Sequence, residues 1–216
     1  MNAGTLPIEL PGQQAFLLPE KALWFPEGKT LVIADVHWGK AGHFRKAGMA
    51  IPARVNTNNA DRLTAIITQT GAERVIFAGD LFHSRHNNEV AAFKTWRAQF
   101  PEVTFQLVIG NHDILEASFY ESCLLELFPE KLFLGGICIM HDQPAVTTDF
   151  VIHGHLHPGI KIAGKGRQQI AVPCFALSDR SLILPAFGDF TGCHYLNAQQ
   201  FQQLYAVTDS AVLRIK

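Results

Sequence analysis

The sequence lacks the features that mark membrane, disordered or strongly basic proteins. Charged residues make up only 17% of its 216 residues, and the formal net charge is -1. This balance gives no global basic field for nucleic acid, although a local basic patch is still allowed. No apolar run approaches the roughly 20 residues of a membrane-spanning helix. The first residues, MNAGTLPIEL, have neither a basic nor an apolar signal segment, so we expect a cytoplasmic protein without membrane contacts.

Cysteine is also scarce. The four cysteines, Cys123, Cys138, Cys174 and Cys193, are dispersed and form no CxxC pair. This spacing argues against a zinc ribbon and against a disulfide framework, so we expect buried free thiols. The sequence also has no internal repeat, no low-complexity stretch and no long linker. We therefore expect a single domain over residues 1–216.

Five apolar runs dominate the first two thirds of the sequence, and each ends in polar residues. Such runs are typical of strands that are buried on both faces. They cover Thr30–Asp35, Arg74–Asp80, Phe105–Asn111, Gly136–His141 and Asp149–His155. Helical spacing of apolar residues predicts helices over Asn59–Thr70 and Asn88–Phe100, which Gly71 and Pro101 would end.

The rest of the sequence reads as mostly antiparallel strands. Two short strands are predicted within Ala15–Phe25, and helical signals fade after residue 155. The later strand-like runs are Ile170–Phe175, Ser181–Phe187, Leu204–Val207 and Ala211–Ile215. An α/β half followed by a β half predicts two sheets packed face to face, with helices outside.

The ends of the five apolar runs carry side chains that bind metals. Ligands of an open α/β sheet lie at the carboxyl ends of its strands, so these side chains would meet at one edge. The candidate ligands are Asp35, His37, Asp80, Asn111, His141, His155 and His157. Side-chain alternation along a strand would let both members of D-x-H, and both of H-x-H, reach one ion. Gly79, Gly110 and Gly154 precede ligands, where the chain must turn sharply or pass close to another backbone.

The types of ligand restrict the ion. Carboxylates, imidazoles and one amide suit manganese, iron or zinc, and they match calcium poorly. Seven ligands are too many for one tetrahedral ion and suit two ions. Taken singly, each Asp could cap a turn and each His could be a hydrogen-bonded core residue. Five motifs of the right type after five apolar strands favour the metal site.

The order D-x-H, G-D, G-N-H-D, H and G-H-x-H, over about residues 30–158, resembles the calcineurin-like metallophosphoesterases. The resemblance implies an α/β fold, a four-layer αββα sandwich of two packed mixed sheets, with a two-metal centre. It also implies two divalent ions, with Mn²⁺ favoured over iron and zinc. Asp80 would bridge the ions, of which one is held by Asp35, His37 and His157 and the other by Asn111, His141 and His155.

A narrower resemblance covers more of the chain. The segments 35–48, 79–85 and 184–192 look like the ligase-associated DNA damage response endonuclease (PdeM) group. This implies a phosphodiesterase or nuclease that acts on DNA in a repair context, with repair ligase or helicase machinery as partners. The alternatives are a phosphatase or pyrophosphohydrolase of a small nucleotide or metabolite, and a non-catalytic module that keeps the fold. The oligomeric state stays open, with a homodimer among the options.

His112 is the candidate catalytic residue. Two ions about 3.5–4 Å apart can clamp a phosphoryl group and lower the pKa of a bound water to about 7. We expect in-line attack by the resulting hydroxide, without a covalent enzyme intermediate. His112 follows the ligand Asn111 and is free to stabilise the transition state or to protonate the leaving oxygen. Asp113 could tune His112 or could serve only in a turn.

Candidate substrate contacts follow the first two motifs. Lys40 and Arg45 lie among basic and aromatic residues, where the basic groups could hold phosphates and Trp38 and Phe44 could stack on bases. The alternative is a solvated loop whose aromatic residues cover the core. Arg85 is a further candidate, with a surface arginine as the alternative.

His83 stands where many members of the resembled family have the second Asp of G-D-x-x-D. The usual Asp–His dyad is therefore in doubt. His83 could contact phosphate, could support the metal ligands or could be a plain loop residue. We expect the remaining histidines, His86, His153 and His194, to be structural or exposed.

Overall fold

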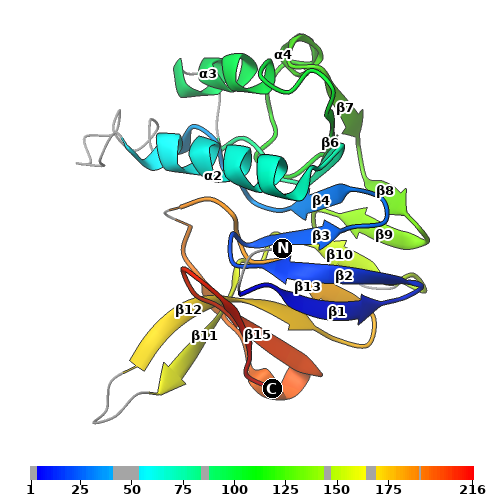
Figure 1. Ribbon diagram of the computed structural model, residues 1–216, viewed down its shortest axis with the longest axis vertical. Helices are drawn as coiled ribbons and strands as arrows, with labels where there is room; N and C mark the ends of the chain where they lie inside the picture. Colours follow the sequence, from blue (N-terminus) through cyan, green and yellow to red (C-terminus); the bar gives the residue numbers. More distant parts are fainter. Residues whose placement is uncertain (1–3, 41–53, 84–87, 144–146, 164–168, 190) are drawn as a thin grey trace.

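The computed structural model describes residues 4–40, 54–83, 88–143, 147–163, 169–189 and 191–216. Two mixed sheets pack face to face, and the α-helices of the described residues lie on the outer side of the first sheet (Figure 1). The predictions for Arg45, Arg85, His86 and Phe44 fall outside the described residues.

The first sheet has seven strands in the order β1-β2-β3-β4-β5-β6-β7. The strands are β1 (Leu6–Leu10), β2 (Gln13–Leu18), β3 (Ala22–Phe25), β4 (Thr30–Ile33), β5 (Arg74–Ala78), β6 (Thr104–Val108) and β7 (Leu125–Phe128). β1 to β4 are antiparallel hairpins, whereas β4 to β7 are parallel. Parallel neighbours need crossovers, and the helices α2 (Arg54–Thr70), α3 (Asn88–Arg97) and α4 (Ala117–Ser122) supply them.

The second sheet has the order β14-β11-β12-β13-β10-β9-β8, with β15 paired to β12 and β16 paired to β15. Its strands are β8 (Lys131–Leu134), β9 (Ile137–Met140), β10 (Val151–His153), β11 (Pro158–Ala163), β12 (Gln169–Leu177), β13 (Ser181–Ile183), β14 (His194–Tyr195), β15 (Gln203–Val207) and β16 (Val212–Arg214). Its centre is parallel, because β10 runs parallel to both β9 and β13.

The apolar runs are continuous because the central strands are buried on both faces. Leu31 and Phe77 point into the cluster beneath the helices, whereas Val32 and Ile76 point into the cluster between the sheets. Ile152 of β10 meets the inter-sheet cluster from the other side. This inter-sheet core fixes the two sheets together and brings their strand ends to one edge.

The predicted two-sheet α/β sandwich is confirmed, and all five apolar runs contain strands. The strands are shorter than predicted, since β4 ends at Ile33 and β10 at His153. Among the described residues, five strands and one α-helix were not predicted: β1, β7, β8, β11, β14 and α4. On the second sheet's outer side, Leu196 and Phe201, around the 3₁₀ turn η2 (Ala198–Gln200), pack on a small apolar cluster. No helix in the described ranges is long and apolar enough to cross a membrane.

Candidate metal centre

The seven candidate ligands converge at the edge where the strands end. Three of them form what we call the first ligand group: Asp35, His37 and His157. Their ligand atoms all lie within 4.8 Å of one another. The other four form the second ligand group: Asp80, Asn111, His141 and His155. The loops of this group follow β5, β6, β9 and β10, so four segments of the chain contribute.

The first ligand group brings acceptor atoms into close contact. Nε2 of His157 lies 3.3 Å from Nε2 of His37 and 3.3 Å from Oδ1 of Asp35. Asp35 is fully buried, and its Oδ1 atom forms no hydrogen bond among the described residues. Burial lowers the pKa of His37 to about 2, with a further contribution from the charge of Lys40. Two imidazoles and a buried carboxylate that face one another in this way fit a bound cation.

The second ligand group is held by contacts within itself. Nε2 of His141 lies 3.5 Å from Oδ1 of Asp80 and 3.1 Å from Nδ1 of His155. The side-chain amide nitrogen of Asn111 lies 3.5 Å from Nδ1 of His155. Asn111 is exposed, so this group opens to solvent.

The prediction that both histidines of H-x-H reach one ion is wrong. His157 lies with the first ligand group and His155 with the second. Side-chain alternation fails here because neither residue is in a strand: β10 ends at His153. Asp35 lies within 4.8 Å of both His157 and the pair of Asp80 and His141, so its carboxylate reaches both groups.

The ligand loops have an unusual backbone. Asp35, His37 and Asp80 have φ angles of 53°, 49° and 50°, and His155 and His157 have 66° and 47°. Side chains other than glycine rarely adopt this left-handed region, and it persists only where the surroundings fix it. Hydrogen bonds between two of these loops fix it here. The N–H of His37 donates to Asp80 O at 3.0 Å, and the N–H of Trp38 donates to Leu81 O at 2.7 Å.

The glycines before the ligands lie where a side chain would collide. A Cβ at Gly110 would lie 2.2 Å from the backbone nitrogen of Asp80, and one at Gly154 would lie 2.3 Å from Oδ2 of Asp35. A Cβ at Gly79 would lie 2.1 Å from the ring of His141. The predicted close approaches are therefore confirmed, since each glycine makes room for a ligand of another loop.

His112 lies beside the second ligand group and is exposed. Its N–H donates to Oδ1 of Asp80 at 2.8 Å. Its ring stacks on His83, with centroids 5.1 Å apart and planes 28° apart, and His83 also meets the ring edge of His37 at 5.3 Å. His83 is therefore part of the centre and not a plain loop residue.

Asp113 has a structural position. Its carboxylate accepts the N–H groups of Gly110 and Phe82, both at 2.9 Å, and so joins two ligand-bearing loops. Burial raises the pKa of Asp113 to about 7. Of the two roles considered, the contacts support the turn role.

Lys40 and Trp38 have different surroundings. Lys40 is partly buried near the carboxylates of Asp35 and Asp80, whose charges oppose the lowering of its pKa by burial. Trp38 is 4% exposed and packs against Phe93 and Trp96. The suggestion that Trp38 stacks on bases is wrong, because its ring covers the core.

Sequence reasoning missed a clamp between α2 and the loop after β13. Nη1 of Arg62 lies 3.1 Å from Oδ1 of Asp189, and Nη2 donates to the carbonyl of Phe187. The same loop pairs with the first ligand loop, since the N–H of Gly188 donates to Asp35 O at 3.0 Å. The only signal for this clamp was the Gly188-Asp189 pair within the segment 184–192.

His153, His194 and three of the four cysteines lie as expected. His153 is buried in β10, with Nδ1 3.1 Å from Gly154 O, and His194 is exposed in β14. All four cysteines are free, and only Cys193 is not fully buried.

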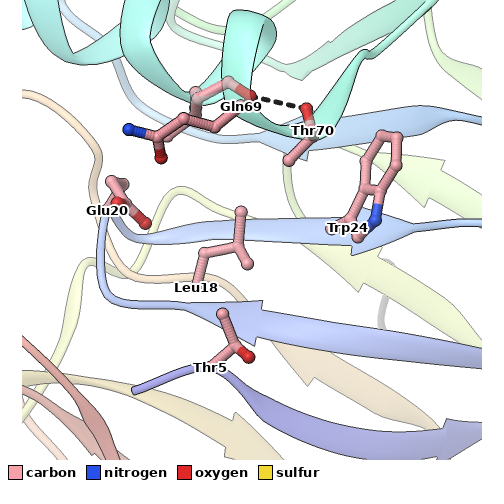
Figure 2. A pocket seen from close by; sticks show the side chains of 7 residues that line it. Thr5, Leu18, Glu20, Trp24, Gln69 and Thr70 are labelled. Carbon is pink, nitrogen blue, oxygen red and sulfur yellow. Dashed lines mark hydrogen bonds between the residues drawn. The ribbon is translucent and has the colours of Figure 1, made fainter. Parts of the chain in front are cut away.

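A cavity of about 240 Å³ lies between α2 and the first strands, away from these groups (Figure 2). It is lined by Thr5, Leu18, Glu20, Trp24, Ile66, Gln69 and Thr70. None of these residues belongs to either ligand group, and Glu20 is the one ionisable side chain among them. This cavity is not part of the candidate metal centre.

Comparisons with known proteins agree with this geometry. The family model described as calcineurin-like phosphoesterase matches residues 28–160. The crystal structure of Pseudomonas putida nuclease MPE superposes with a TM-score of 0.83, at 28% identity over 98% of this chain and 100% of that chain. The E. coli phosphoesterase Yfce matches with a TM-score of 0.46, at 14% identity over 85% of this chain and 95% of that one. No curated protein matches in sequence. The chain therefore belongs to the calcineurin-like phosphoesterase family and is a metal-dependent hydrolase of phosphate esters.

Proposed function

We propose that the chain is a phosphodiesterase that cleaves DNA with two divalent metal ions. The observation that carries this proposal is the convergence of two ligand groups around the buried carboxylate of Asp35, whose Oδ1 atom has no hydrogen bond within the described residues. Carboxylate and imidazole donors of this kind suit Mn²⁺, iron or zinc. We propose Mn²⁺, with the first ion on the first ligand group and the second on the second ligand group.

Bound ions would supply a water of lowered pKa and positive charge for the phosphoryl oxygens. The protein's own residues would position the diester and handle its protons. We propose that His112, exposed beside Asn111, stabilises the transition-state charge or protonates the leaving oxygen. Its backbone bond to Asp80 and its stack on His83 hold the ring at the open side of the centre. Lys40, near both carboxylates, is the proposed phosphate contact on the other loop.

DNA is the proposed substrate because the similar Pseudomonas putida protein is a nuclease and covers the chain almost completely. The resemblance to the PdeM group supports a repair context. Partner ligases or helicases and a homodimer belong to the same proposal. With a net charge of -1, DNA binding would depend on local basic groups and not on a global basic field.

A substrate panel tests the proposal. Manganese-loaded protein would be assayed on bis(4-nitrophenyl) phosphate, 4-nitrophenyl phosphate, cyclic nucleotides, and single-stranded and duplex DNA. We expect cleavage of the aryl diester and of DNA, with little cleavage of the monoester. Cleavage of the monoester alone would instead indicate a small-molecule phosphatase. Metal analysis of the active protein should give two ions per chain.

A further inference from the structure

A small cavity beside the first ligand group joins it to a lysine that the proposed chemistry does not use. The cavity has a volume of about 120 Å³, and both His157 and Lys21 line it. The rest of its wall is largely uncharged and includes Pro173, Gly188 and Gly192. Lys21 lies in the turn between β2 and β3, outside every loop that carries a candidate ligand.

The charge of Lys21 has no direct partner. Within the described residues, its side chain forms no hydrogen bond or ion pair. The nearest carboxylate in this cavity is that of Asp189, and Arg62 and Asn58 already bind its two oxygens, at 3.1 and 2.5 Å. Cys193 also lines the cavity, but burial raises the pKa of its thiol, so it stays neutral at pH 7. The cavity therefore presents a cation with no direct hydrogen-bond or ion-pair partner among the described residues, and the one carboxylate of its wall, Asp189, is already bound by Arg62 and Asn58.

Partial burial makes that charge costly to leave unpaired. Burial lowers the pKa of Lys21 and the neighbouring Arg62 lowers it further, while the charges of Asp189 and Asp209 only partly oppose this lowering. Lys21 also has a φ of 65°, at a turn position that glycine or asparagine would occupy with less strain. An ammonium group kept at a strained and partly desolvated position fits an anionic ligand that restores its lost interactions.

Lys21 also borders a larger cavity of about 340 Å³ on its other side. That cavity contains Glu20 and Asp209 as well as Arg62 and Asp189. Its acidic groups match an anion poorly. The cavity shared with His157 is therefore the better anion site, and it is also the one that reaches the metal centre.

We propose that Lys21 binds a second phosphate group of the substrate, in the cavity that joins it to His157. This rests on the proposed phosphodiesterase function and adds to it that the substrate carries more than one phosphate. A polynucleotide strand satisfies this requirement, whereas a single aryl diester does not. Lys21 is a substrate-binding residue that sets which diesters are preferred.

The test compares Lys21→Gln with Lys21→Arg, which keeps the charge, and with Lys131→Gln, which removes an exposed lysine of the edge strand β8. All three avoid glycine, so the backbone cost at Lys21 is unchanged. For a single-stranded oligonucleotide, Lys21→Gln should raise KM about fivefold to tenfold with kcat nearly unchanged. The salt dependence of binding should fall by about 0.7 in log–log slope. On bis(4-nitrophenyl) phosphate, kcat/KM should stay within about twofold, while Lys21→Arg restores most of the affinity.

A binding measurement separates this inference from the proposed function. Fluorescence anisotropy of a labelled oligonucleotide in EDTA reports affinity without turnover, and Lys21→Gln should weaken it by the same factor. If the wild type cleaves nothing, the proposed function fails, but anisotropy still decides whether Lys21 holds a phosphate. Unchanged binding overturns the inference. The inference is also overturned if Lys21→Gln lowers kcat/KM equally on the oligonucleotide and on bis(4-nitrophenyl) phosphate and lowers Tm, because Lys21 would then have a structural role.

Discussion

The two ligand groups differ in how they satisfy their polar atoms. In the first group, Asp35 and His37 are buried, and Oδ1 of Asp35 forms no hydrogen bond among the described residues. In the second, Asp80 accepts the N–H of His112, and His141 lies against both His155 and the carbonyl of Ala78. Oδ2 of Asp35 accepts the N–H of His155 at 2.9 Å, so the buried side-chain atoms of the first group without a hydrogen bond among those residues are Oδ1 of Asp35 and Nδ1 of His37. A cation would satisfy Oδ1, whereas the second group is held by its own contacts and stays open to substrate. We expect the first to govern metal-dependent stability and the second to govern turnover.

The largest effect should come from Asp80→Ala, since the resemblance gives this carboxylate the bridging role. If Asp80 bridges, the variant should lose ligands of both ions, and kcat/KM on the aryl diester should fall about 10⁴-fold or more. Metal analysis should show fewer than one ion per chain. The geometry also lets Asp35 reach both groups. If Asp80→Ala keeps one ion per chain and Asp35→Ala keeps none, Asp35 and not Asp80 is the bridging ligand.

His112→Ala should lower kcat about 10³-fold, because it removes a proton donor or charge stabiliser beside the second group. Metal content should remain at the wild-type value, since His112 is not proposed as a ligand. His112→Asn keeps a hydrogen-bond donor and should recover part of kcat if charge stabilisation dominates. Full turnover by a metal-loaded His112→Ala protein would refute the role.

Gly110→Ala should disturb the second group without changing any ligand. The added Cβ would lie 2.2 Å from the backbone nitrogen of Asp80, so the Asp80 and Asn111 loops must separate. A misplacement of about 1 Å can cost about 10²-fold in kcat/KM. Gly28→Ala is the matched control, because its nearest contact is 3.4 Å away. Equal activity of the two variants would show that the loops yield easily.

Removal of metal should lower the thermal stability of the protein, chiefly through the first ligand group. Chelation by EDTA should lower Tm by about 5–10 °C, corresponding to an ion present at roughly 100 times its Kd. In Asp35→Asn a neutral amide replaces the buried carboxylate, so the Tm difference between loaded and chelated protein should shrink. Asn111→Ala, in the second group, should keep most of that difference. An equal change in both variants would contradict the division between the groups.

The smallest effect should come from Arg62→Ala, which releases the loop that pairs with the first group. Loss of the bonds to Asp189 and Phe187 should cost about 2 kcal/mol and lower Tm by about 4–8 °C. Arg62→Lys should recover only a minor share of this stability, because one ammonium group cannot reproduce both bonds of the guanidinium. A Tm fall that disappears in the metal-free protein would show that the clamp acts through the metal site.

The apolar runs predicted the central strands well, since a strand buried on both faces needs continuous apolar sequence. The edge strands β1, β7, β8 and β14 were missed because each is partly or, for β14, fully exposed and carries a weak apolar pattern. The ligands were identified by type and order, but their division between two groups was not. That division depends on left-handed backbone at His155 and His157, which a period-two pattern cannot express. The Arg62–Asp189 clamp joins residues 127 apart, so no short-range pattern could pair them.

Backbone hydrogen bonds between two ligand loops fix the spacing of their carboxylates. The loops after β4 and β5 continue to bond backbone to backbone beyond the sheet, as far as the bridge between Trp38 and Phe82. The separation of Asp35 and Asp80 is therefore set by hydrogen bonds between the two backbones, before any cation binds. Loading the protein should thus need almost no ordering of these two loops. Hydrogen exchange of their amides should therefore already be slow in the apo form.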